Sequence, residues 1–425
     1  MRIILRRHAR TTALLMAIAL CAPAAASSQD IAITNARIIA GTGQVIDAGT
    51  IIVRDGKIAT VTAGSVQLPP RVPVIDARGL SAMPGFIDGH KHLADGPTGK
   101  AWMQSLLEAG YTTVLIGGGP AEANLALARK IESGEYNGPR VIPSGAVVLR
   151  QTPAEARAAI QALAKLGVKH TGEIALTPEP APPQAEIETL KAIVDEAKKV
   201  GIQVNVHAVS SPAMTAAIDA GVTRLVHLPN KDWTSYEQAD AVAKSGAIVA
   251  GLIAFGAPNI DTLSQGPAPV QWPKDNTPRF RDGKPWPEAL IGANRDARGR
   301  ATGTEGGYTI INARRIWDAD PNHTTISYST DQNADDLVVL EHELKSFSIV
   351  FSMADIHRII GANAARFVGM ADQIGTLEPG KLADIILLDG DPTRNIYEML
   401  KTKVVLKEGR IVVDKRAPAG RPSTR

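Results

Sequence analysis

Two histidines spaced one residue apart, His90 and His92, end the apolar segment MPGFIDGHKHL. Alternate side chains of a β-strand point to the same face, so a strand here would place both imidazoles on one side. Imidazole nitrogens bind zinc at about 2.0–2.1 Å. The pair alone fits either half of a metal site or two unrelated surface histidines.

Further candidate ligands lie at the ends of later strand-like runs. Glu173 lies in KHTGEIALTP, His207 in VNVHAV, His227 in LVHLPN, and Asp331 in SYSTDQN. Each buried polar side chain needs a hydrogen-bond partner, and so many at one level are hard to satisfy with protein groups alone. Divalent cations would satisfy all of them, so the pattern favours a metal site.

The elements that must position these side chains alternate between apolar strands and helical segments rich in Ala, Glu and Lys. Such alternation predicts parallel βα units, and eight of them predict an α/β fold, the (β/α)8 or TIM barrel. Active sites of such barrels lie at the C-terminal ends of the strands. The eight runs are GFIDGHKH, TTVLIGG, RVIPSG, KHTGEIAL, IQVNVHAVS, RLVHLPN, AIVAGLIAF and TISYSTD.

Both ends of the chain show a different pattern of short strands joined by Gly, Asn and Asp turns. In particular, DGKI between two β-branched runs is a hairpin signal. We therefore expect residues 27–83 and 373–425 to form one small composite β-sandwich domain, with the barrel spanning 84–372. Residues from about 256 to 323 read as an insertion, either over the barrel mouth or away from the site.

The first 26 residues have the features of a secretory signal peptide: four arginines, an apolar stretch and an Ala-Ala-Ala cleavage site before Ser27. We expect a periplasmic or secreted protein with no membrane anchoring after cleavage. Removing the leader takes the formal charge from +3 to −1. The remaining chain therefore lacks the excess of positive charge that is typical of nucleic-acid-binding proteins. It also removes Cys21, the only cysteine, which excludes disulfides and a thiol nucleophile.

The segment MPGFIDGHKHL resembles the first-strand signature of the amidohydrolase superfamily of metal-dependent hydrolases. The segments STDQNADDLVVLEHELKSF, ADIHRIIGANAARFVG and IGTLEPGKLADIILLDGDP resemble imidazolonepropionase-like and prolidase-like members, the latter related to Xaa-Pro dipeptidases. The resemblance runs from the first β unit to about Lys415. It implies a TIM barrel, a small β-sandwich built from both chain ends, and a metal-activated hydroxide.

The resemblance also implies roles for single residues. His90 and His92 would bind one metal, and His207 and His227 a second. Asp331 would contact the first metal and the attacking water, and act as the catalytic proton shuttle. Zinc is the metal we expect, with two ions per chain; iron or manganese, and a single ion, are the alternatives.

The fourth strand departs from the commonest family pattern, because Glu173 stands where many members have a carboxylated lysine that bridges two metals. A glutamate can bridge as well, although its stem is shorter. Lys169 is the rival, since alternate positions share a face. However, it lies about 13 Å nearer the start of the strand, at roughly 3.3 Å per residue. We therefore expect Glu173 to be a metal ligand.

The remaining polar residues receive lesser roles. His323 and Asn230 are candidates for substrate binding. His342 and His357 are expected to pack behind the site, and His170 to point away from Glu173.

The expected reaction is hydrolysis of a C–N amide bond in a small molecule: a dipeptide, an N-acyl amino acid or a related carboxamide. A cyclic amide or amidine hydrolase, or a heterocycle deaminase, is the alternative among enzymes. From another class, the alternative is a periplasmic binding protein without catalysis. The sequence leaves a homo-oligomer open.

Overall fold

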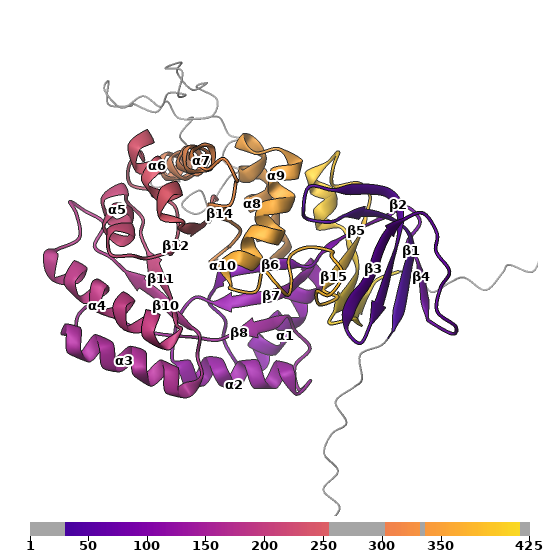
Figure 1. Cartoon of the computed structure of the whole chain (residues 1–425), viewed down its shortest axis with the longest axis horizontal. Helices are drawn as coiled ribbons and strands as arrows, with labels where there is room; N and C mark the ends of the chain where they lie inside the picture. Colours follow the sequence, from indigo (N-terminus) through magenta and orange to yellow (C-terminus); the bar gives the residue numbers. More distant parts are fainter. Residues whose placement is uncertain (1–29, 255–301, 332–335, 417–425) are drawn as a thin grey trace, which may run out of the picture.

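The computed structural model describes residues 30–254, 302–331 and 336–416 (Figure 1). The predicted signal peptide and most of the predicted insertion lie outside these residues. No helix in the described part is long and apolar enough to cross a membrane.

One eight-stranded sheet combines the two ends of the chain. Its order is β17-β16-β15-β5-β1-β2-β3, with β4 beside β1. The junction of the two ends is β5, which pairs antiparallel with β15 and parallel with β1. The strands are β1 (Ile31–Ile39), β2 (Val45–Arg54), β3 (Lys57–Ala63), β4 (Val74–Asp76), β5 (Leu80–Pro84), β15 (Ile385–Asp389), β16 (Thr402–Lys407) and β17 (Arg410–Asp414).

The predicted β-sandwich is not confirmed, because these strands belong to one hydrogen-bonded sheet and not to two. Backbone bonds of Ile58 with Lys381 and Gly380 (2.8 Å each) tie β3 to the segment before β15. A separate apolar core, including Ile33 and Leu406, lies among these strands. The predicted hairpin is confirmed: Asp55 and Gly56 join β2 to β3 with positive φ angles of 49° and 75°.

All eight predicted barrel strands form, and their pairings are parallel. The third run is split into two short strands by Pro143, which has no backbone N–H to donate. The strands are β6 (Phe86–Lys91), β7 (Tyr111–Ile116), β8 (Arg140–Ile142), β9 (Ser144–Gly145), β10 (His170–Ala175), β11 (Gln203–His207), β12 (Arg224–Val226), β13 (Ile248–Ala250) and β14 (Ile326–Ser327).

The strands form a TIM-barrel-type α/β fold, but they do not join into one continuous ladder. One sheet holds β6, β7 and β8, and the other holds β9 to β14. A few backbone bonds bridge the two sheets. Among them, Gly89 N donates to Tyr328 O (3.1 Å) beyond β14, and Glu173 N donates to Gly117 O (2.7 Å) beyond β7. The predicted closed barrel is therefore confirmed only in part.

One helix follows each strand unit and covers the outside of the strands (Figure 1). These helices are α1 (Gly96–Ala109), α2 (Ala121–Glu132), α3 (Pro153–Leu166), α4 (Gln184–Val200), α5 (Ser211–Asp219), α6 (Tyr236–Ser245), α7 (Thr302–Ala319) and α8 (Asp336–Val350). Two shorter helices, α9 (Met353–Arg358) and α10 (Ala364–Phe367), lead back to the sheet of the chain ends.

The described part of the predicted insertion contains a regular helix. Residues 302–319 form α7, the regular helix between β13 and β14. The start of this helix contains Gly306 and Gly307, and the low helix propensity of glycine conceals it in the sequence.

Candidate metal centre

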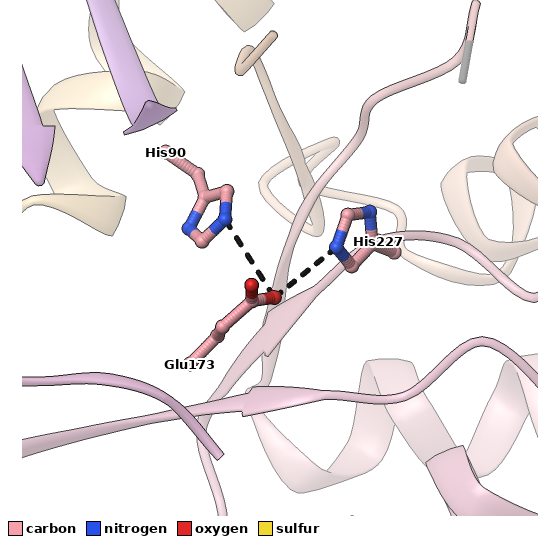
Figure 2. A group of neighbouring side chains, drawn as sticks. All are labelled: His90, Glu173 and His227. Atoms are coloured by element: carbon pink, nitrogen blue, oxygen red, sulfur yellow. Dashed lines mark hydrogen bonds and ion pairs between the residues drawn. The ribbon is translucent and has the colours of Figure 1, made fainter. Parts of the chain in front are cut away.

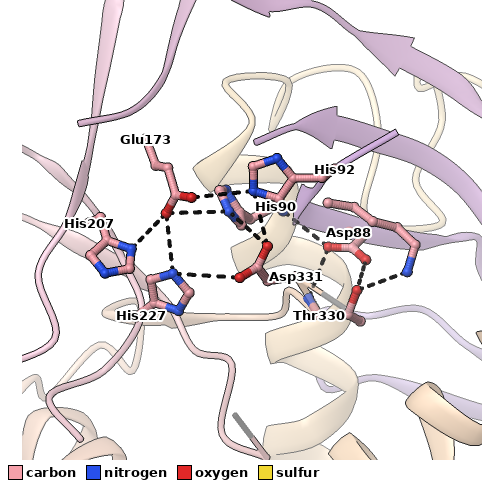
Figure 3. A network of polar contacts seen from close by, with 9 residues as sticks. Asp88, His90, His92, Glu173, His207, His227, Thr330 and Asp331 are labelled. Atoms are coloured by element: carbon pink, nitrogen blue, oxygen red, sulfur yellow. Dashed lines mark hydrogen bonds and ion pairs between the residues drawn. The ribbon is translucent and has the colours of Figure 1, made fainter. Parts of the chain in front are cut away.

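Six polar side chains from five strand ends meet at one end of the barrel, and we call them the histidine cluster (Figure 3). They are the six residues predicted as ligands, brought together because parallel strands end on the same face. Their roles remain predictions. The cluster consists of His90 and His92 at the end of β6, Glu173 in β10, His207 in β11, His227 after β12 and Asp331 after β14.

Glu173 lies at the centre of the histidine cluster, with four imidazoles around its carboxylate (Figures 2 and 3). Its Oε2 atom lies 2.8 Å from His207 Nδ1, 3.3 Å from His227 Nε2 and 3.6 Å from His90 Nε2. Its Oε1 atom lies 3.3 Å from His92 Nε2. Lys169, the rival ligand, precedes β10 and is exposed at the opposite end of the strand.

Asp331 closes the cluster from the far side of the barrel (Figure 3). Its Oδ1 atom lies 3.2 Å from His92 Nε2 and 3.4 Å from His90 Nε2, and its Oδ2 atom 3.8 Å from His227 Nε2. The Asp331 carboxylate therefore lies close to histidines that are predicted to bind each of the two metals.

Most of these separations are too long for good hydrogen bonds, which range from about 2.7 to 3.2 Å. Tetrahedral ligands at about 2.1 Å from one ion would lie about 3.4 Å apart. Moreover, the buried Nε2 atom of His90 makes no hydrogen bond with any described residue. The residues present therefore fit a divalent cation.

Two groups of atoms meet the spacing of a metal site, with all ligand atoms within 4.8 Å of one another. One group is His90, Glu173 and His227, and the other is His90, His92 and Asp331. His207 belongs to neither group, although its Nδ1 atom lies 2.8 Å from Oε2 of Glu173.

The electrostatics of the cluster favour ionised carboxylates. Burial opposes ionisation of Glu173 and Asp331, but the surrounding imidazoles outweigh it and hold the pKa of both carboxyls well below the usual range. In turn, hydrogen bonds to Asp331 and Glu173 raise the pKa of His92 to about 10. Without a metal, the two carboxylates therefore favour the protonated form of the His92 ring. A divalent cation would compete with this proton, because a histidine binds metal in its neutral form.

The backbone near the ligands adopts unusual conformations and approaches one ligand closely. His227 and Asp331 have positive φ angles of 68° and 50°, a strained region for residues other than glycine. Such strain is concentrated at functional sites. A Cβ atom on Gly117 would lie 2.5 Å from the ring of His90, so only glycine fits beside this ligand.

The structure does not place His323 in the site, and this prediction is wrong. His323 lies after α7 and before β14, at the end of the barrel opposite the ligands, and its ring stacks on Trp317 at 4.7 Å. A residue just before a strand lies at the wrong end of a barrel for chemistry. Asn230 follows β12 on the ligand side, and its buried Oδ1 atom has no hydrogen-bond partner among the described residues, so its role stays a prediction.

The other three described histidines lie apart from the cluster. His170 starts β10 at the opposite end from Glu173 and is buried. His342 is half-buried on α8, and His357 is buried on α9.

The sequence reasoning missed residues that support the ligands, among them Gly117, Asp88 and Thr330. The run of three glycines at 117–119, directly after a strand, was the available signal for a close approach of backbone to a ligand. No local signal marks the contact of Asp88 with Thr330, because 242 positions separate them.

A model of the amidohydrolase family matches residues 81–412. Among curated relatives, N-acyl-D-aspartate deacylase of Alcaligenes xylosoxydans xylosoxydans is 40% identical over 22% of this chain and 18% of its own. Enamidase of Eubacterium barkeri is 30% identical over 38% of this chain and 45% of its own. The chain thus matches less than half the length of each of these relatives.

Among solved structures, a Xaa-Pro dipeptidase with methionine bound in its active site has a TM-score of 0.69 and 20% sequence identity. The match covers 90% of this chain and 99% of that chain. At this identity the likeness shows the fold.

Proposed function

Because this chain belongs to the amidohydrolase family, we propose that it hydrolyses a C–N amide bond with divalent cations held by the histidine cluster. The observation that carries the proposal is the convergence of four imidazoles on the carboxylate of Glu173, with Asp331 opposite. A binding protein without catalysis would need no second carboxylate at this point.

The ligand sets that we propose are those of the family resemblance, and the closely spaced group His90, His92 and Asp331 supports the first of them. His90, His92 and Asp331 would hold one cation, and His207 and His227 would help to hold a second, with Glu173 shared between the two. A bound divalent cation lowers the pKa of water and polarises a carbonyl group. We expect zinc and two ions per chain, with iron or manganese as alternatives.

Asp331 would carry the proton during the reaction. Its carboxylate is held in the ionised form and is partly exposed, so it can reach both water and substrate. We infer that it accepts a proton from water and delivers it to the leaving nitrogen, which is general acid–base catalysis.

The substrate we propose is an acyclic amide of a small molecule: a dipeptide, an N-acyl amino acid or a related carboxamide. The names of two similar proteins, an N-acyl-D-aspartate deacylase and a Xaa-Pro dipeptidase, support this class. Neither likeness identifies the scissile bond. The predicted signal peptide further supports a periplasmic or secreted enzyme, and amino-terminal sequencing of exported protein that began at Met1 would contradict this.

A hydrolysis screen tests the proposed function. Metal-free protein and protein loaded with zinc, manganese or iron would be incubated with dipeptides, N-acyl amino acids and carboxamides, and released amine would be measured. We expect turnover only in loaded protein. Absence of metal binding, or turnover that survives complete removal of metal, would contradict the proposal.

A further inference from the structure

A buried carboxylate, Asp88, joins the two strand ends that carry His90, His92 and Asp331 (Figure 3). Its Oδ1 atom accepts hydrogen bonds from the backbone N–H of His90 (3.0 Å) and of Thr330 (3.1 Å). Its Oδ2 atom accepts the hydroxyl proton of Thr330 at 2.6 Å. Asp88 and Thr330 are both fully buried, so water does not compete for these bonds.

The hydroxyl group of Thr330 is fixed on both sides. It donates to Asp88 and accepts a hydrogen bond from Nζ of Lys91 at 3.2 Å. Lys91 also lies 3.3 Å from Oδ1 of Asp336, which accepts a bond from the indole N–H of Trp102 (3.1 Å). This chain of contacts connects β6 to the end of β14 and to helices α8 and α1.

Thr330 directly precedes Asp331, whose backbone is strained at a φ angle of 50°. A strained conformation persists only where the surroundings hold it from several sides. Here the backbone N–H of Asp331 donates to the carbonyl of His90 (2.9 Å), and Thr330 is anchored to Asp88 through both its N–H and its hydroxyl. These bonds fix the direction of the Asp331 side chain relative to His90 and His92.

We propose that Asp88 and Thr330 are positioning residues that set the geometry of the ligand group His90, His92 and Asp331. Neither side chain is among the ligands; they act through the strand ends they join. This inference rests on the proposed function, because it assumes that the ligand group holds a cation.

The variant Thr330→Val tests the inference, because valine keeps the shape of threonine and loses the hydroxyl. Oδ2 of Asp88 loses its donor and Lys91 loses one acceptor. We expect the affinity of metal-free protein for Zn²⁺, measured by competition with a chelator, to fall by about 10–100-fold, the usual effect of residues that orient metal ligands. Thr330→Ser, which restores the hydroxyl, should bind Zn²⁺ like the wild type.

Thr325→Val is the matched control. Thr325 is buried just before β14, at the opposite end from the ligands, and its hydroxyl donates to the carbonyl of Ile316 at 3.3 Å. This variant also loses one buried hydroxyl but should keep the Zn²⁺ affinity of the wild type. If Thr330→Val fails to fold, Asp88→Asn gives a second test: it keeps one oxygen for the two N–H groups but cannot accept the hydroxyl proton, and should weaken Zn²⁺ binding similarly.

Two results would overturn different claims. A wild type that binds Zn²⁺, together with folded Thr330→Val and Asp88→Asn variants of equal affinity, would overturn the positioning role alone. A wild type that binds none of the divalent metals would overturn the proposed function, and this inference with it.

Discussion

The histidine cluster and a second charged cluster around Arg140 lie at opposite ends of the barrel strands and differ in how their charges are satisfied. Arg140 starts β8 and reaches across to the sheet of the chain ends. Its guanidinium donates to Asp384 at 2.7 Å, to Glu408 at 2.6 Å and to Thr113 at 2.8 Å. We call Arg140, Asp384, Glu408 and Thr113 the Arg140 cluster.

The difference between the two clusters separates a structural site from a chemical one. In the Arg140 cluster, the guanidinium makes short, direct hydrogen bonds to two carboxylates and a hydroxyl. In the histidine cluster most contacts lie at 3.2–3.8 Å, and a buried nitrogen of His90 lacks a hydrogen bond with described residues. As metal ligands the four imidazoles would be neutral, so the two carboxylates would give the cluster a net charge of −2, which a divalent cation would balance. We therefore interpret the Arg140 cluster, whose charges are paired within the protein, as structural, and the histidine cluster, whose carboxylates need a cation, as a ligand-binding site.

The largest effect we expect comes from Asp331→Asn in the histidine cluster. Asparagine keeps the size of the side chain and an oxygen for the metal, but it cannot take a proton from water. We expect kcat to fall by about 10²–10⁴-fold while the free energy of unfolding stays nearly unchanged.

Metal content must be measured alongside the kinetics of Asp331→Asn. The alternative role for Asp331 is to cap a turn at the start of the following segment, which asparagine would do equally well. Near-wild-type kcat in metal-replete Asp331→Asn protein would therefore refute the proton shuttle.

The converse prediction concerns Arg140→Met in the Arg140 cluster. The variant leaves Asp384, which is buried, without its cation, and an unpaired buried charge costs about 3–5 kcal/mol of stability. We expect urea unfolding to show a loss of this size, with unchanged Zn²⁺ affinity. Arg78→Met is the matched control, because the Arg78–Asp76 pair is exposed and worth about 0–1 kcal/mol. If Arg140→Met and Arg78→Met lost the same free energy of unfolding, the structural role of the Arg140 cluster would be refuted.

Glu173→Gln tests the charge balance of the histidine cluster. It removes one negative charge and keeps the shape, so the four imidazoles then surround a neutral amide. We expect at least about a 100-fold loss of metal affinity, the upper end of what loss of a supporting residue costs. The free energy of unfolding of metal-free protein should fall by less than in Arg140→Met. Full metal content and activity in this variant would exclude Glu173 as a shared ligand.

Much of the histidine cluster could be predicted from sequence because it depends on local patterns. Strand periodicity and the alternation of strands with helices place residues such as His90 and His227 at strand ends, and parallel strands end on the same face. The prediction for His323 rested instead on its position at the edge of the expected insertion, and it fails because this residue lies just before β14, at the end of the barrel opposite the ligands.

The rest of the structure depends on contacts between distant positions. Asp88 meets Thr330, and Arg140 meets Asp384, across 242 and 244 positions of the chain. The pairing of β5 with β15 likewise decides that the chain ends share one sheet. Short strands carry no local signal for their partners, so the sequence predicted that the chain ends join in one β unit but not that their strands form a single sheet.

The smallest effect we predict concerns His170, a buried histidine outside both clusters. Burial, together with the nearby Arg224 guanidinium, lowers the pKa of His170 to about 3, whereas the unfolded chain has an ordinary value of about 6.5. Below pH 6.5 the unfolded state therefore takes up a proton that the folded state refuses, and stability falls as the pH decreases towards 3. Between pH 7.5 and 5.5 this group should cost about 1.4 kcal/mol. Unlike His90 and His92, whose pKa values are raised beside Asp331 and Glu173, His170 has no carboxylate to offset that cost.

The measurement is urea unfolding of the wild type and of His170→Gln at pH 7.5 and 5.5, both metal-free. Glutamine can still donate a hydrogen bond but does not titrate, so the variant should lose about 1.4 kcal/mol less than the wild type over this interval. His357→Gln is the matched comparison, because burial also lowers the pKa of His357, to about 4, and it should behave in the same way. The histidines of the cluster are unchanged in both variants, so their titration cancels in each difference. Equal losses in the wild type and His170→Gln would show that His170 accepts a proton in the folded state, which would remove the contrast between a buried histidine inside the cluster and one outside it.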